Sequence, residues 1–116
     1  MEETMKGIEN KYRTRDYEVH IRFPEFTCLC PMTSQPDFAE VTIRYIPDKL
    51  IVELKSLKFY LNSFRNKGIF HEEAVNRILD DFVAAIIPRR VEVVGKFNVR
   101  GGIYTTVRAE WPAPEG

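Results

Sequence analysis

The sequence predicts an α+β domain in which one antiparallel four-stranded sheet carries two helices on a single face. Two observations predict this class. Apolar and polar residues alternate near both ends of the chain, as in half-buried strands, whereas apolar residues recur at helical spacing only in the middle. The order strand, strand, helix, helix, strand, strand is typical of helices gathered on one face of an antiparallel sheet. A length of 116 residues fits one such domain.

The first two strands are predicted by alternation over residues 17–23 and 38–45. Residues 1–16 are polar and show no such period, so we interpret them as a flexible lead-in. Residues 26–36, between the two strands, are rich in turn-forming residues. They are therefore predicted to form a loop.

The middle of the chain is predicted to hold the two helices. Residues 50–54 form a short strand, after which the hydrophobic period changes to that of an amphipathic helix over residues 56–66. Gly68 is placed to end this helix. A second helix is predicted over residues 71–87, where apolar residues fall on one face, and Pro88 ends it.

Two further strands complete the predicted sheet. Residues 91–99 and 103–110 are predicted to pair through a glycine turn at residues 101–102. Residues 111–116 hold two prolines and are interpreted as a C-terminal tail. The domain itself is therefore predicted to span residues 17–110.

Composition limits the classes of function. The chain has 17 basic and 17 acidic residues, and its formal net charge of zero disfavours non-specific nucleic-acid binding. The longest strictly apolar run, residues 82–87, is too short to cross a membrane. The first residues show no basic region followed by an apolar stretch. We therefore expect a cytoplasmic protein with no membrane partner.

The predicted sheet leaves two outer strands unpaired. Strict alternation also places apolar side chains on the face away from the helices, which then needs a cover. Copies of the chain that join edge to edge into a barrel would satisfy both needs. We therefore expect a homo-oligomer.

Cys30 is the candidate nucleophile. A free cysteine is usually a small buried hydrophobe, but a loop position before Pro31 would let this thiol reach a ligand. Cys28 has no such position and is interpreted as structural. Asp37 is either a turn residue that bonds nearby N–H groups or a carboxylic acid close to Cys30, and spacing leaves both open. The two cysteines and two histidines lack the spacing of a zinc site, so no metal is expected.

Basic and acidic residues around the helices suggest ligand contacts. Lys55 and Lys58 lie on one side of the first helix near its N-terminus, where free N–H groups favour anions, so this end is a candidate phosphate site. The Arg100–Gly101 turn could close over the same ligand. Glu72 either complements the dipole of the second helix or presents two acceptor oxygens to a guanine-like ring edge.

Five segments together resemble one family. Residues 53–60, Glu-Leu-Lys-Ser-Leu-Lys-Phe-Tyr, resemble the signature of the NADPH-dependent 7-cyano-7-deazaguanine reductases, the nitrile reductases of queuosine biosynthesis. Four further segments resemble those that carry the family's nucleophile, acid, substrate and cofactor contacts: residues 26–31, 35–38, 70–73 and 100–102. The likeness covers about residues 17–104, and the short chain resembles the unimodular branch.

The resemblance implies a fold and an activity. The fold would be the tunnelling fold (T-fold), ββααββ, whose units join into a barrel, here as a homo-decamer of two pentamers. The activity would be the four-electron reduction of the nitrile of 7-cyano-7-deazaguanine to 7-aminomethyl-7-deazaguanine. Two NADPH molecules would act per turnover, with no metal and no direct contact with nucleic acid.

The resemblance also implies roles for individual residues. Cys30 would attack the nitrile carbon to form a covalent thioimide, and Asp37 would donate the proton. Five residues would bind the substrate: Val52, Glu53, Leu54, His71 and Glu72. Five would bind NADPH: Leu54, Lys55, Lys58, Arg100 and Gly101.

Two departures and two alternatives accompany the resemblance. Phe59 stands where the signature more often has Leu or Tyr, and residues 103–106 depart from the family's usual continuation. One alternative is an amidine-forming relative that uses the same cysteine on the same nitrile in tRNA, in archaeosine formation. The other is a non-catalytic module that binds a purine-like ring. The cofactor signature at residues 53–60 favours reduction.

Overall fold

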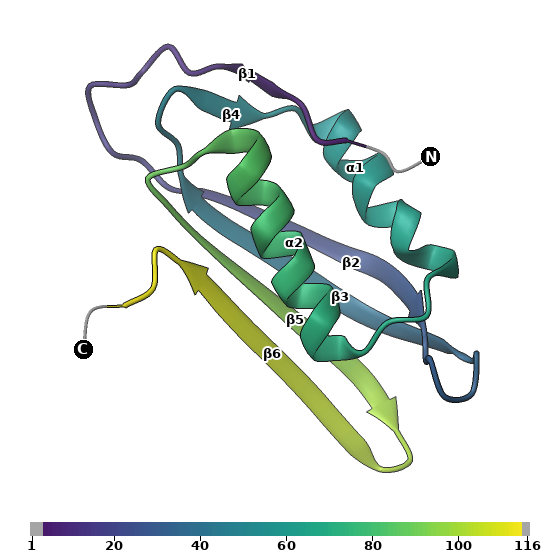
Figure 1. Cartoon of the computed structure of the whole chain (residues 1–116). Helices are drawn as coiled ribbons and strands as arrows, with labels where there is room; N and C mark the ends of the chain where they lie inside the picture. The colour runs from purple at the N-terminus through teal and green to yellow at the C-terminus, as the bar shows by residue number, and fades with distance from the viewer. Residues whose placement is uncertain (1–3, 115–116) are drawn as a thin grey trace.

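The computed structural model describes residues 4–114 and has the expected α+β class (Figure 1). Four long strands form one antiparallel sheet in the order β2-β3-β5-β6, and both helices lie on the same face of it. The elements in chain order are β1 (Gly7–Glu9), β2 (Val19–Leu29), β3 (Pro36–Ile46), β4 (Leu50–Val52), α1 (Leu54–Asn62), the 3₁₀ turn η1 (Ser63–Asn66), α2 (His71–Ile86), β5 (Arg90–Arg100) and β6 (Ile103–Trp111).

The four strands of the main sheet are longer than the sequence predicted, whereas β4 ends at Val52 instead of residue 54. β2 continues past Pro24 as far as Leu29, and β3 already begins at Pro36, so the predicted loop over residues 26–36 shrinks to residues 30–35. β6 includes Trp111, which we had assigned to the tail. The alternation in β2 is interrupted at Pro24 because this residue has no N–H to donate to the ladder.

The first helix is shorter than predicted, because its last turn tightens into η1. Its buried side chains include Leu57 and Leu61, which face the sheet. The second helix ends at Ile86, after which Ile87 takes a left-handed conformation with φ of 48° and Pro88 prevents continuation. No helix within residues 4–114 is long and apolar enough to span a membrane.

The core lies between the helices and the sheet. Phe82 of α2 is fully buried and meets the ring of Tyr45 on β3 edge-on, with ring centroids 4.8 Å apart. Near the other end of the sheet, Phe26 contacts Phe64 of η1 and Phe97 of β5. These aromatic contacts join each helical segment to the strands beneath it.

The lead-in is more ordered than predicted. Residues 7–9 form β1, which pairs with β4 in a separate two-stranded sheet (Figure 1). Met5 and Asn10 are buried, and the Asn10 side chain donates to Asp48 O and accepts from the Tyr17 hydroxyl. The correction has a simple cause: a three-residue strand is too short to display a period.

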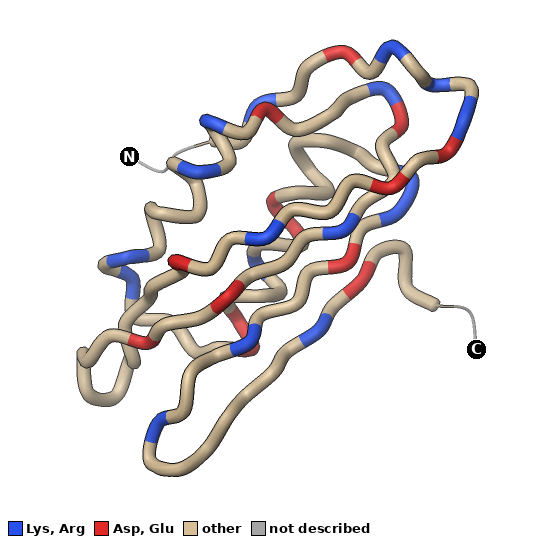
Figure 2. Tube along the Cα trace, turned by 180° about the vertical axis from the view of Figure 1, so that it is seen from behind, with Lys and Arg blue, Asp and Glu red and all other residues tan. Residues whose placement is uncertain are grey.

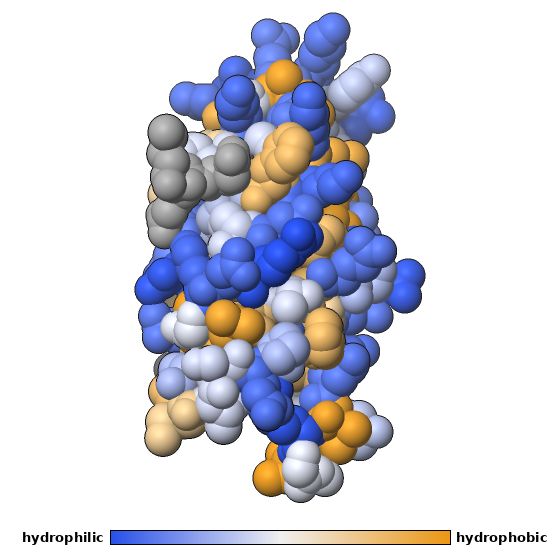
Figure 3. Space-filling model, turned by 90° about the vertical axis from the view of Figure 1, so that its right-hand side faces the viewer, coloured by the Kyte–Doolittle hydropathy of each residue, from blue (hydrophilic) through white to orange (hydrophobic). Residues whose placement is uncertain are grey.

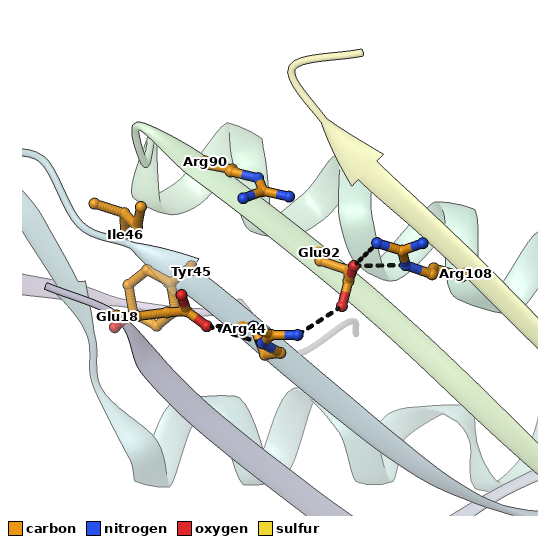
Figure 4. Close-up of a pocket in the computed structure, with 7 residues that line it drawn as sticks. All are labelled: Glu18, Arg44, Tyr45, Ile46, Arg90, Glu92 and Arg108. Atoms are coloured by element: carbon orange, nitrogen blue, oxygen red, sulfur yellow. Dashed lines mark hydrogen bonds and ion pairs between the residues drawn. The ribbon is translucent and has the colours of Figure 1, made fainter. Parts of the chain in front are cut away.

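The sheet face away from the helices is polar, contrary to our expectation of apolar side chains. Figure 2 shows basic and acidic residues side by side along its strands. In the close-up of Figure 4, Arg44 bridges Glu18 and Glu92, and Glu92 also binds Arg108. These side chains help to line a pocket of about 270 Å³. Charged side chains on this face therefore find partners within it.

Phe82 provides a test of this packing. Phe82→Ala is expected to lower the free energy of unfolding by about 3–5 kcal/mol, because it leaves a cavity beneath α2. Urea unfolding followed by circular dichroism measures the change. Asp80→Ala, at an exposed position of the same helix, is the matched control and is expected to change it by less than about 0.5 kcal/mol. Equal effects from both variants would contradict the packing described here.

Candidate active site

A bulge in β2 determines which side chains reach the end of the sheet beside α2. The register with β3 shifts between Phe23 and Phe26, so β2 uses one residue more than its partner at residues 24–25. This extra residue reverses the alternation and places Phe26 and Cys28 on the helix-covered face, where both are buried. Cys28 then pairs directly with Asp37 of β3.

The short loop between β2 and β3 holds Cys30. The Cys30 N–H donates to Gln35 O, and the Ser34 N–H donates to Cys30 O, both at 2.8 Å. Ser34 closes this turn with a φ of 61°. Because both backbone groups of Cys30 are bonded, its thiol has a defined place at the strand end and is partly exposed.

The pKa values of the two thiols, which are only two residues apart, are shifted in opposite directions. Hydrogen bonds lower the pKa of Cys30, first from the Thr33 hydroxyl and then from the backbone of Met32 and Thr33. Burial raises the pKa of Cys28 to about 11, and the negative charge of Asp37 adds to this effect. Of the two sulfurs, Cys30 is therefore the one that forms a thiolate more readily, which is what a nucleophilic role requires.

Asp37 is buried and held on both carboxylate oxygens. The Arg100 Nε lies 2.6 Å from Oδ1, and the His71 Nε2 lies 3.1 Å from Oδ2. The His71 ring is stacked on Phe97, with centroids 3.8 Å apart and planes 6° from parallel. The site thus places a thiol whose pKa is lowered near a buried carboxyl group that is paired with an arginine and a histidine.

Glu72, the second residue of α2, lies beside this group. Its carboxylate carries no hydrogen bond or ion pair among residues 4–114, and its side chain is exposed. Gly101 lies in the β5–β6 turn with a φ of 59° and open space around it. One end of the sheet therefore gathers six of the predicted residues: Cys30, Asp37, His71, Glu72, Arg100 and Gly101.

Glu53 has a structural role that the sequence analysis missed. It is the N-cap of α1, and its carboxylate accepts from Lys55 N at 2.6 Å and from Ser56 N at 2.8 Å. These bonds lower the pKa of Glu53. The N–H groups that we expected to be free for a phosphate are therefore occupied by the chain's own carboxylate.

The remaining predicted residues form a second group, of which Val52 lies far from Cys30 in the same chain. The Val52 N–H donates to the Tyr45 hydroxyl at 3.0 Å, which places β4 beside Tyr45. Tyr45 and Asp37 lie eight residues apart on one strand, which is roughly 26 Å. Val52 is buried, whereas Leu54, Lys55 and Lys58 are exposed. The predicted site is thus divided into two groups, and one chain does not bring Val52 of the second group to Asp37 of the first.

Sequence reasoning missed two residues that contact the group around Cys30 and Asp37, namely Thr33 and Phe97. Thr33 was counted only as a turn former, and Phe97 only as part of an alternating strand. The stack of Phe97 on His71 joins elements that are distant in the sequence, so no local pattern could have revealed it. The departure from alternation at residues 24–25 was a readable sign of the β2 bulge.

Apolar side chains are exposed around the same end of the sheet. Met32, Phe38, Phe70 and Ile103 are each at least half exposed. Figure 3, which views the molecule from the right-hand side of Figure 1, shows hydrophobic side chains at the lower end, where the hairpins lie. Within residues 4–114, no cluster of three or more His, Cys, Asp or Glu side chains is arranged to hold a metal ion.

Comparison with known proteins gives concordant matches. A family model described as "QueF: QueF-like protein" matches residues 36–115. The NADPH-dependent 7-cyano-7-deazaguanine reductase of Anaeromyxobacter sp. is 62% identical over 105 residues, which cover 90% of this chain and 86% of that protein. The reductase of Nitrosomonas europaea is 58% identical over 106 residues, which cover 91% and 76%.

A solved structure shares the fold. The crystal structure of the archaeosine synthase QueF-Like in the apo form matches with a TM-score of 0.75 and 27% identity, over 86% of this chain and 96% of that one. The identity to the reductases is about twice as high and extends over most of the chain. The chain therefore belongs to the QueF-like protein family, on the side of the NADPH-dependent 7-cyano-7-deazaguanine reductases.

Proposed function

We propose that this protein reduces the nitrile of 7-cyano-7-deazaguanine to 7-aminomethyl-7-deazaguanine with two molecules of NADPH. The observation that carries the proposal is the Cys30 thiol, whose pKa is lowered, beside the buried Asp37–His71 pair. The high identity to proteins named as these reductases supports the same reaction. The reaction would supply queuosine biosynthesis, in the cytoplasm and without direct contact with RNA.

Cys30 and Asp37 have complementary tasks in this reaction. The Cys30 thiolate adds to the nitrile carbon, and the electron pair of one C–N π bond moves to nitrogen. Asp37 donates a proton to that nitrogen, which leaves a neutral thioimide bonded to the enzyme. Covalent addition thus converts a poor hydride acceptor into a C=N group that is easier to reduce.

NADPH, when bound, would supply the hydrides for this reduction, one to the thioimide carbon and one to the imine left after the C–S bond breaks. Two hydrides and two protons balance the change from nitrile to primary amine. Lys55 and Lys58 are exposed cations of the kind that bind phosphate groups. The Arg100–Gly101 turn adds a further cation and a glycine whose backbone is open to a ligand. The role of these residues, and of Leu54, toward NADPH is part of the proposal.

Ring recognition is assigned to both groups of residues. His71 and the unpaired carboxylate of Glu72 would hold the ring edge beside Cys30, and the backbone around Val52 and Leu54 with Glu53 would complete the pocket. Val52, beside Tyr45, lies roughly 26 Å along β3 from Asp37, which far exceeds the width of a bicyclic ring. We therefore infer that neighbouring copies each contribute one group to a shared pocket.

Assembly through the sheet edges would bring such groups together. β2 and β6 are the outer strands of the four-stranded sheet and offer free backbone groups to another copy. The exposed apolar side chains near Cys30 also need a cover, and a closed pocket would protect the imine from hydrolysis while the cofactor exchanges. A ring of copies, as in the expected homo-decamer of two pentamers, would satisfy these requirements.

Covalent addition is tested by intact mass without cofactor. The wild-type chain is expected to gain the mass of the nitrile on incubation with 7-cyano-7-deazaguanine, and added NADPH is expected to release the amine. Cys30→Ala is expected to show neither the adduct nor turnover, whereas Cys28→Ala keeps the adduct. An active Cys30→Ala variant would refute the thioimide route. An adduct that persists with NADPH would favour the amidine-forming relative, and its absence in the wild type would favour a binding module.

The pH dependence of addition tests the tuning of Cys30. The adduct rate is expected to rise with pH as the thiolate forms, with a midpoint below that of an ordinary cysteine because its pKa is lowered. Thr33→Val removes the hydroxyl that stabilises the thiolate, so its midpoint is expected to move to higher pH. Thr42→Val, on another part of the sheet, is the control and keeps the wild-type profile. A Thr33→Val profile that overlays the wild type would show that the hydroxyl does not act on the sulfur.

The shared pocket is tested by mixing two inactive variants. Cys30→Ala lacks the nucleophile of one group, and Glu53→Ser lacks a carboxylate of the other while keeping a good N-cap for α1. Each variant alone is expected to be inactive, but copies unfolded and refolded together are expected to regain activity through pockets that combine two intact groups. A mixture as inactive as its components would place the whole site within one chain.

A further inference from the structure

β5 contains a second bulge, at the level of the active site. Phe97 pairs with Thr105 of β6 and Arg100 pairs with Ile103, so β5 uses three steps where β6 uses two. In a regular ladder, residue 99 would share the face of Phe97 and Arg100 would point away. The extra residue therefore moves Arg100 onto the helix-covered face.

The register with β3 shows what this shift achieves. Ala39 pairs with Phe97. Continued by two residues on each strand, this register would place Asp37 of β3 opposite residue 99 of β5. Because of the bulge, Arg100 occupies that position instead. The result is the 2.6 Å contact between Arg100 Nε and Asp37 Oδ1. A regular strand would have put a valine there.

Arg100 also donates a hydrogen bond to the backbone next to Asp37. Its Nη2 donates to Pro36 O at 2.6 Å, so the guanidinium binds both the carboxylate and the peptide immediately before it. On the opposite side, Phe97 fixes the plane of the His71 ring whose Nε2 reaches Oδ2. Of the two residues that flank the bulge, Arg100 is thus one partner of the carboxylate and Phe97 holds the other, His71.

Resting on the proposed function, we propose that Arg100 is a positioning residue, which the β5 bulge aims at Asp37 to orient the carboxyl group for proton transfer before any cofactor arrives. This role extends beyond cofactor binding and does not conflict with it. A guanidinium has five N–H donors, and the contacts to Asp37 and Pro36 leave others for a phosphate. The ion pair is partly exposed, with Arg100 at 35%, so its contribution to stability is small and its main effect is on geometry.

The cofactor-free half-reaction separates the two roles of Arg100. A residue that binds only NADPH has no influence on adduct formation in its absence, whereas a residue that positions Asp37 does. Arg100→Met is expected to slow adduct formation on Cys30 by about tenfold to a hundredfold without cofactor. Arg100→Lys keeps the positive charge but loses the planar guanidinium with its two-pronged set of N–H donors. This variant is expected to recover part of the rate of adduct formation. Lys96→Met removes an exposed cation from the same strand and is expected to react at the wild-type rate.

A second measurement requires neither nitrile nor cofactor. The chain has two histidines, so the imidazole signals of His71 and His20 are readily told apart in an NMR spectrum of the free protein. Arg100→Met is expected to shift the ring signals of His71, because the carboxylate that faces Nε2 loses its other partner, and to leave His20 unchanged. Lys96→Met is expected to shift neither.

Two results would overturn the positioning role: an Arg100→Met variant that forms the cofactor-free adduct at the wild-type rate, and His71 signals that remain in place in that variant. A wild-type chain that forms no adduct would overturn the proposed function instead. The His71 spectra would then decide the positioning role alone.

Discussion

The active site depends on a single buried carboxylate. A carboxyl group cannot be buried without polar partners, and Asp37 finds them in Arg100 and His71, one at each of its two oxygens. These partners come from the end of β5 and the start of α2, so satisfying one side chain brings three elements together. The Cys30 loop follows, because β2 pairs with β3 along the stretch that contains Asp37. The chemistry and the architecture at this end of the sheet thus have a common cause.

Much of the fold could be read from the sequence because its major elements obey simple periods. The four sheet strands, the two helices and their placement on one face follow from alternation, helical spacing and chain order. Three features could not be read. β1 is too short to show a period, the strand lengths depend on pairing partners, and the charged ladder through Glu92 makes the second face polar.

The candidate site, like the fold, could be predicted from the sequence only in part. Cys30 and Asp37 were predicted from their motifs and stay predictions, and the pKa of Cys30 is lowered as a nucleophile needs. The contact between Arg100 and Asp37 was not foreseeable, since it depends on an extra residue in a strand pairing. The capping role of Glu53 was missed because its carboxylate was considered only as a ligand group. Local chemistry is visible in a sequence, whereas register and distance emerge only when the strands are assembled.

The ordered lead-in has a practical consequence for handling the protein. The Glu53 N–H donates to Lys6 O, and the Lys6 N–H donates to the hydroxyl of Ser56, so the opening residues are fastened to the first turn of α1. Truncating the chain to remove them would strip hydrogen-bond partners from the turn that carries the cofactor signature. Sequence appended after Trp111, at the other end of the described residues, leaves this attachment intact.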